Sequence, residues 1–127
     1  MVQAVLPLKH WVCEVLSSSV HRYKTYNLAA PEAFMLERNI IAAIMRHLKT
    51  VPHCFFWKTH GGMYGTAGMP DIIICLNGRF VALEVKIPTG KLTKIQESTL
   101  NQIKDANGEA FKVTSLQEAK EIIESLS

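Results

Sequence analysis

The stretch that decides the fold runs from residue 70 to residue 86 and reads PDIIICLNGRFVALEVK. Two apolar runs, at residues 72–76 and 80–85, flank Asn77-Gly78. This dipeptide is the one that most favours a two-residue turn with positive φ at both central positions. The pattern therefore predicts a β-hairpin in which Leu76 and Arg79 close the turn.

The register of this hairpin brings two acids together. Counting back from the turn places Asp71 opposite Glu84, with Cβ atoms roughly 5 Å apart on one face. Facing carboxylates destabilise a strand pair unless a cation lies between them. Lys86 lies two residues beyond Glu84 and so points to the same face. A bulge or a three-residue turn would instead separate the two acids.

The rest of the chain alternates helical and extended patterns. Helix starts are indicated by Pro31 and by two capping-box patterns, Thr93-x-x-Gln96 and Ser115-x-x-Glu118, while Gly108 indicates a helix end. Both faces of the hairpin strands are apolar, which suits a sheet covered by helices on both sides. The expected α/β order is a helix over residues 31–49, strands over 54–58, 72–76 and 80–85, a helix over 93–107, a strand over 110–114 and a helix over 115–126.

Composition bounds the class of protein. The 127 residues are 48% apolar and 20% charged with a net charge of +3, as in an ordinary globular domain that is mildly basic. Three scattered cysteines, Cys13, Cys54 and Cys75, fit neither a disulfide framework nor a zinc site. No apolar run is long enough for a membrane span, so we expect a cytoplasmic protein.

The first thirty residues are the least informative part. Apolar residues recur at helical spacing between Trp11 and Val20 and end in a serine run. Residues 1–30 are therefore interpreted as an accessory helix, a dimer contact or a leader outside the fold. The remainder, residues 31–127, is expected to form one domain.

A third acid joins the first two. Glu37 lies on the same helical stripe as Ile41 and Leu48, so we expect it to meet the sheet face that carries Asp71 and Glu84. The alternative explanation of Glu37 is that the helix macrodipole stabilises a negative charge in an early turn of the helix. Converging carboxylates are typical ligands of Mg²⁺ or Mn²⁺. A nearby lysine could orient or deprotonate a water molecule for attack on phosphorus. By itself, however, Lys86 is better explained as a strand-end cation that pairs with Glu84.

These residues resemble a known pattern. Pro70-Asp71 followed by Glu84-Val85-Lys86 is similar to the active-site motif of the PD-(D/E)xK nuclease superfamily. The context GMPDIII, VALEVK and GKLTKIQ resembles the VRR-NUC branch, with Glu37 matching its helix glutamate. The similarity covers roughly residues 32–115.

The resemblance implies a restriction-endonuclease-like core, in which a central mixed sheet is flanked by helices. It also implies a divalent metal held by Glu37, Asp71, Glu84 and the Val85 carbonyl, with Lys86 positioning the water. Gln96 is implied to assist, although its capping role alone explains it. Stand-alone members resemble homodimeric endonucleases that act on branched DNA such as four-way junctions.

Four cations remain as candidate DNA contacts: Lys58, His60, Lys91 and Lys94. Each is equally well explained as a solvated surface residue. The glycines of residues 61–68 lack the Gly-Lys-Ser/Thr ending of a phosphate-binding loop, so no nucleotide cofactor is expected. Two other functions stay open: a non-catalytic nucleic-acid-binding module, and an interaction domain whose N-terminal segment recruits a partner.

Overall fold

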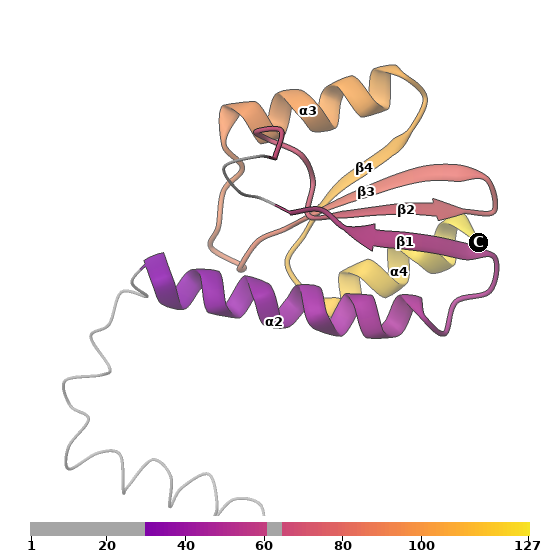
Figure 1. Ribbon diagram of the computed structural model, residues 1–127, viewed down its shortest axis with the longest axis horizontal. Coiled ribbons are helices and arrows are strands. Elements are labelled where there is room, and N and C mark those ends of the chain that lie inside the picture. Colours follow the sequence, from indigo (N-terminus) through magenta and orange to yellow (C-terminus); the bar gives the residue numbers. More distant parts are fainter. Residues whose placement is uncertain (1–29, 61–64) are drawn as a thin grey trace, which may run out of the picture. The chain divides into compact units, whose positions relative to one another are not determined.

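The computed structural model describes residues 30–60 and 65–127 of the chain, with side chains of the first helix described from Leu36 onward. Its contacts divide the chain into two units, residues 1–32 and 33–127. The predicted accessory segment lies almost entirely outside the described residues, and the predicted boundary at residue 31 stays a prediction. The elements are α2 (Ala30–Leu48), β1 (Cys54–Lys58), β2 (Ile72–Leu76), β3 (Arg79–Val85), α3 (Lys94–Asp105), β4 (Glu109–Val113) and α4 (Leu116–Leu126) (Figure 1).

The four strands form one mixed sheet in the order β1-β2-β3-β4. The first three strands are antiparallel, and β4 runs parallel to β3. The predicted hairpin is confirmed, because Cys75 pairs with Phe80 and Ile73 with Ala82. Both turn residues have positive φ, 49° at Asn77 and 80° at Gly78, as the two-residue turn requires. The register that sets Asp71 toward Glu84 therefore holds.

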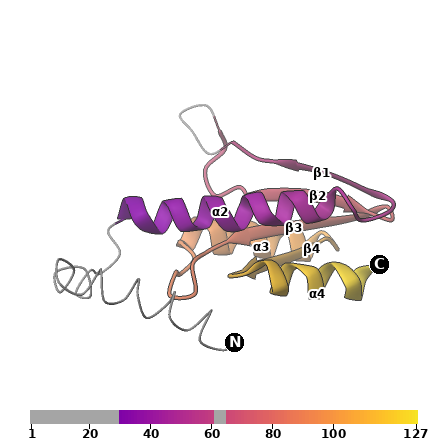
Figure 2. The same cartoon turned by 90° about the horizontal axis from the view of Figure 1, so that it is seen from below.

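The helices cover the sheet unequally. Figure 1 shows α3 on one side of the sheet and α2 with α4 on the other, and Figure 2 shows α2 and α4 along the same side with α3 behind the strands. The main core lies under α2 and α4, where apolar side chains of both helices meet alternate residues of all four strands. Its fully buried members include Ile44, Leu48, Ile72, Ile74, Leu76, Val81, Leu83, Val85 and Val113.

The core under α3 is smaller. It consists of Ile73, Ala82, Leu100 and Ala110, with Leu92 and Ile103 packed against it. These residues come from α3 and its lead-in and from β2, β3 and β4, so the α3 side of β1 lies beyond this core.

Two predicted helix ends differ in detail. The left-handed residue after α3 is Asn107, with φ 66°, rather than Gly108, because asparagine also tolerates this conformation. At the start of α4, Ser115 accepts a hydrogen bond from the Glu118 N–H, but the Glu118 side chain accepts from the N–H and hydroxyl of Thr114. The second capping box is thus only half formed. Among the described residues, no helix has the length and apolar character needed to cross a membrane.

Candidate active site

Asp71 is clamped between two strands. Its Oδ2 accepts a hydrogen bond of 2.8 Å from the Val85 N–H on β3. On the β1 side, the Thr59 N–H donates to the Asp71 carbonyl at 2.9 Å, and the Thr59 hydroxyl donates to the Pro70 carbonyl at 2.5 Å. Burial raises the pKa of Asp71, although the Val85 N–H and the Lys86 charge oppose the rise. Sequence reasoning missed Thr59, since nothing in its neighbourhood marks it as a support for Asp71.

Glu84 is the buried acid of the site. Its side chain is only 2% exposed, and its Oε1 lies 3.2 Å from the Lys86 Nζ. The other oxygen, Oε2, is buried and has no hydrogen-bond partner. Burial, with a further contribution from the nearby Asp71 charge, raises the pKa of Glu84 to about 7, although Lys86 opposes this. A carboxylate in this state favours either a proton or a cation beside it.

Lys86 lies between two acids. Its Nζ is 3.2 Å from Glu84 Oε1 and 4.0 Å from Glu37 Oε1. Helix α2, which carries Glu37, packs on one face of the sheet. Ala82 lies on the other face, and Glu84, two residues further along β3, shares that face with Ala82. Glu37 therefore approaches from the other face of the sheet than expected, but it meets Lys86 at the end of the strands, where the acids were expected to converge.

Gln96 performs two roles at once. Its Oε1 accepts from the Thr93 N–H at 2.9 Å, while the Gln96 N–H donates to the Thr93 hydroxyl at 3.2 Å, which completes the capping box of α3. Its Nε2 donates to Glu84 Oε1 at 2.5 Å. The capping residue is thus also a direct partner of the buried acid, and the start of α3 is tied to the site.

The cations differ in position. A cavity of about 150 Å³ is lined by Glu37, Lys58, His60 and Asp71, among others, and a second of about 340 Å³ by His60, Asp71 and residues of the glycine loop. Lys91 and Lys94 are exposed just before and at the start of α3. In the described parts of the chain, neither Lys91 nor Lys94 forms a hydrogen bond or an ion pair with Glu37, Asp71 or Glu84. All four remain predicted DNA contacts.

The acids suit a hard divalent ion in their chemistry. Asp71 and Glu84 are carboxylates with raised pKa values, and Glu84 keeps one buried oxygen without a partner. Mg²⁺ commonly takes one or two carboxylates and completes its shell with water and phosphate oxygens. Across residues 30–60 and 65–127, however, no three acidic, histidine or cysteine side chains gather closely enough to hold an ion as a group. A donor set centred on Asp71 and Glu84 therefore fits better than a preformed cage of three acids.

Comparison with solved structures identifies the fold that carries these residues. A solved structure described as a VRR_NUC domain matches with a TM-score of 0.59 and 19% sequence identity, covering 70% of this chain and 95% of that chain. The chain has the VRR_NUC fold. The sequence by itself matches no family model and no curated protein, so the likeness rests on three-dimensional structure.

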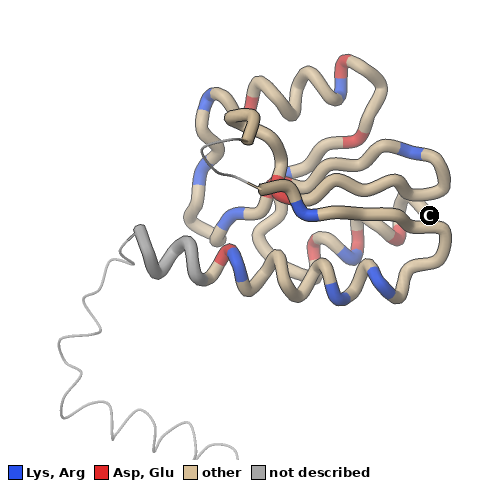
Figure 3. Tube along the Cα trace, in the orientation of Figure 1, with Lys and Arg blue, Asp and Glu red and all other residues tan. Residues whose placement is uncertain are grey.

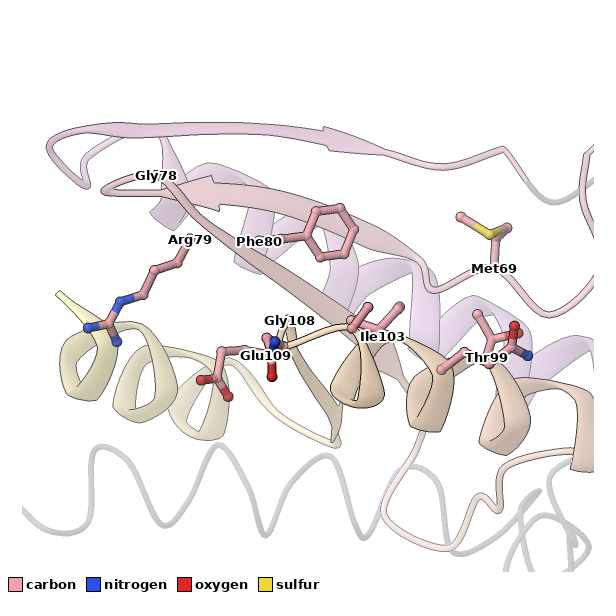
Figure 4. A pocket seen from close by; sticks show the side chains of 11 residues that line it. Met69, Gly78, Arg79, Phe80, Thr99, Ile103, Gly108 and Glu109 are labelled. Carbon is pink, nitrogen blue, oxygen red and sulfur yellow. The ribbon is translucent and has the colours of Figure 1, made fainter.

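A further cavity lies away from the acids. This cavity of about 760 Å³ lies between α3 and the start of β3. Figure 4 shows Phe80 of β3 facing Ile103 of α3, with Met69 near the rim, while Arg79 points away. Its walls are mainly apolar, and neither Asp71 nor Glu84 lines it. The cavity therefore plays no part in the acid cluster.

Proposed function

We propose that this protein is a divalent-metal-dependent endonuclease that hydrolyses phosphodiester bonds in DNA. One observation carries the proposal: the buried Glu84 holds Lys86 at 3.2 Å while Asp71 is fixed to the adjacent Val85 N–H, on a VRR_NUC fold. This arrangement gathers carboxylate oxygens and one ammonium at the end of a rigid sheet. Such a grouping suits phosphoryl chemistry, in which negative charge must be neutralised.

The residues then take the following roles. Asp71 and Glu84 are the ligands best placed for a Mg²⁺ or Mn²⁺ ion, and Glu37 and the Val85 carbonyl complete the proposed set. When bound, the ion would neutralise the acids and polarise a phosphate. Lys86 would orient the attacking water, since its ammonium already lies among the acids.

Support from Gln96 is part of the same proposal. Its amide donates to Glu84 Oε1, the oxygen that also contacts Lys86. This bond holds the Glu84 carboxylate in one orientation, so that its other oxygen stays available. Gln96 is therefore a positioning residue in this proposal.

Selectivity for branched DNA is the finer part of the proposal. It follows from the resemblance of the motifs to stand-alone VRR-NUC proteins, as does assembly into a homodimer. The mildly basic charge of +3 is compatible with a polyanionic substrate.

The test is cleavage of labelled single-stranded, duplex, flapped and four-way-junction DNA with Mg²⁺, Mn²⁺ or EDTA. Wild type is compared with Asp71→Ala, and folding of the variant is checked by circular dichroism. We expect cleavage that requires metal and is lost in the variant. Undiminished cleavage by Asp71→Ala would refute the assigned roles. Binding without any cleavage, retained in EDTA, would instead support a non-catalytic nucleic-acid-binding module.

A further inference from the structure

The sheet face on the α3 side is only partly covered. Helix α3 packs over the β3 and β4 half through Leu100 and Ile103. On β1, the outermost strand, Phe55 is 69% exposed and Trp57 is 45% exposed. In the part of the chain that the structure describes, no helix packs over these two rings. Exposed large aromatic side chains gathered on one face indicate a binding surface.

The two rings are arranged to receive flat groups. Their centroids are 5.9 Å apart and their planes are tilted by 49°, so neither ring stacks face to face on the other. Phe55 is paired with the exposed Cys75, and the apolar surface continues from there to Phe80 on β3. Each ring therefore keeps a face open beside an apolar surface.

This aromatic pair is aligned with the acids. Trp57 is paired with Ile73 on β2, and the bond from the Thr59 N–H to the Asp71 carbonyl continues the same register. Trp57 thus lies on the same sheet face as Asp71. Thr59, the residue beside Asp71, is two residues further along than Trp57, a distance of roughly 7 Å along the strand. A chain that lay over Phe55 and Trp57 would reach Asp71 next.

Lys58 is the cation on the strand that carries the aromatic pair. Residues 38–70 contain Arg38, Arg46, Lys49 and Lys58 but no aspartate or glutamate. Arg38 and Arg46 lie on α2, which packs on the other face of the sheet, and Figure 3 shows acids beside cations on α2 and near the end of β1. Lys58 is exposed at the end of β1 that lies nearest Asp71. Its charge would attract a phosphate of a DNA strand that reaches Asp71.

We propose that Phe55 and Trp57 form a stacking platform for the bases of an unpaired DNA strand that leads to the Asp71–Glu84 site. Exposed aromatic side chains on which bases can stack are a general means of binding single strands, because every base offers a flat face. Lys58 alternates with Trp57 along β1 and lines the small cavity that Asp71 also lines, so it would meet a phosphate at the acid site rather than over the rings. The inference deepens the proposed function, on which it rests for the identity of the substrate, by naming which part of a branched DNA is held here.

The experiment measures binding of fluorescently labelled oligothymidylate to the full chain in EDTA, so that no cleavage intervenes. Trp57→Leu removes the ring but keeps an apolar side chain, and Trp57→Phe keeps a ring as the matched control. Phe55→Leu provides an independent second variant at the more exposed position. Both residues are surface-exposed, and thermal unfolding verifies that each variant folds.

We expect Trp57→Leu and Phe55→Leu each to weaken oligothymidylate binding by about 5- to 150-fold. Trp57→Phe should remain within about threefold of wild type, and affinity for blunt duplex should be unchanged within about twofold in all variants. Equal binding by wild type and both leucine variants would overturn the platform. Loss of self-association in Trp57→Leu with oligothymidylate binding unchanged would also overturn it and assign the face to a second copy.

The two proposals fail separately. If binding depends on Trp57 while no DNA is cut under any metal condition, the platform stands and the nuclease proposal fails. If metal-dependent cleavage is found but the Trp57→Leu and Phe55→Leu variants bind unpaired strands as wild type does, the nuclease proposal stands and the platform proposal is overturned.

Discussion

Glu84 is the one buried charged side chain among the residues that the structure describes. It lies where water cannot solvate it, and Lys86 and Gln96 satisfy only one of its two oxygens. Asp71 adds a second negative charge nearby. In the metal-free protein this pair is a source of instability, because burial and like charge both disfavour ionisation.

The pH dependence of stability should reveal this directly. The pKa of Glu84 is raised from 4.5 to about 7, so the folded state binds its proton more tightly than the unfolded state. The free energy of unfolding should therefore fall as pH rises between these values, by about 3 kcal/mol at most. Urea unfolding in EDTA should show this fall in wild type and a much smaller one in Glu84→Gln. Parallel pH profiles of the two proteins would contradict the prediction.

Two substitutions at Asp71 should differ in stability. Asp71→Asn removes the charge but keeps an oxygen to accept the Val85 N–H, whereas Asp71→Ala leaves this N–H unpaired. An unpaired buried donor costs about 1–3 kcal/mol. We expect the asparagine variant to equal or exceed wild type in urea unfolding without metal, and the alanine variant to be less stable than the asparagine variant. Equal stability of the two variants would show that the bond contributes little.

At the scale of elements, the site depends on where α3 begins. The capping box places Gln96 at the third position of the helix, from which its amide reaches Glu84. The loop before β2 is held against the same helix turn, because Gly68 lies close to Ile95. The glycine loop and the helix start thus brace the segment that leads to Asp71.

The two roles of Gln96 can be separated by mutation. Gln96→Glu keeps a capping-box residue but presents an acid to Glu84, so we expect a stable helix and a fall in cleavage of about tenfold or more. Thr93→Ala removes the cap and should lower stability by about 1 kcal/mol with a smaller effect on cleavage. Circular dichroism, urea unfolding and cleavage rates check both. Wild-type cleavage by Gln96→Glu would exclude a role for its amide.

Gly68 and Gly78 form a matched pair for testing the loop. Both have φ of 80°, but an added Cβ would meet Ile95 at Gly68 and nothing within 4 Å at Gly78. Gly78→Ala should cost about 1 kcal/mol from backbone strain alone. Gly68→Ala should cost more and should also reduce cleavage, because the loop must move off α3. Urea unfolding that shows equal losses would mean that the contact with Ile95 is unimportant.

At the scale of the whole molecule, the described core lies within residues 33–127, the second of the two units of the chain. All the buried apolar side chains found in the described residues lie between Ile41 and Ile123. Both helical layers and all four strands lie in residues 30–127.

Truncation tests whether residues 30–127 fold without residues 1–29. A fragment of residues 30–127 should unfold cooperatively in urea and retain metal-dependent cleavage, because it contains the whole core and every proposed site residue. Full-length protein is the control for both measurements. A fragment without a cooperative transition would show that residues 1–29 are part of the fold, contrary to the predicted boundary.

Much of the fold follows from local sequence alone. Asn77-Gly78 specifies the turn, and the turn specifies which residues of the hairpin face each other, because side chains alternate strictly along a strand. The order of helices and strands follows from apolar periodicity in the same way. The placement of Asp71 toward Glu84 could therefore be predicted without any tertiary information.

Only the tertiary structure shows which face of the sheet each helix covers and which residues contact the acids. The stripe on α2 shows that Glu37 faces inward, but only packing shows that α2 lies on the face away from Glu84. Thr59 holds the backbone at Pro70 and Asp71 through two hydrogen bonds that leave no pattern in the sequence. The resemblance implied that Gln96 assists, but only the structure shows that its amide donates to Glu84. The exposure of Phe55 and Trp57 likewise depends on how far α3 extends across the sheet. Local preferences determined the elements and the hairpin register, whereas burial and the partners of each acid arose only when distant segments packed together.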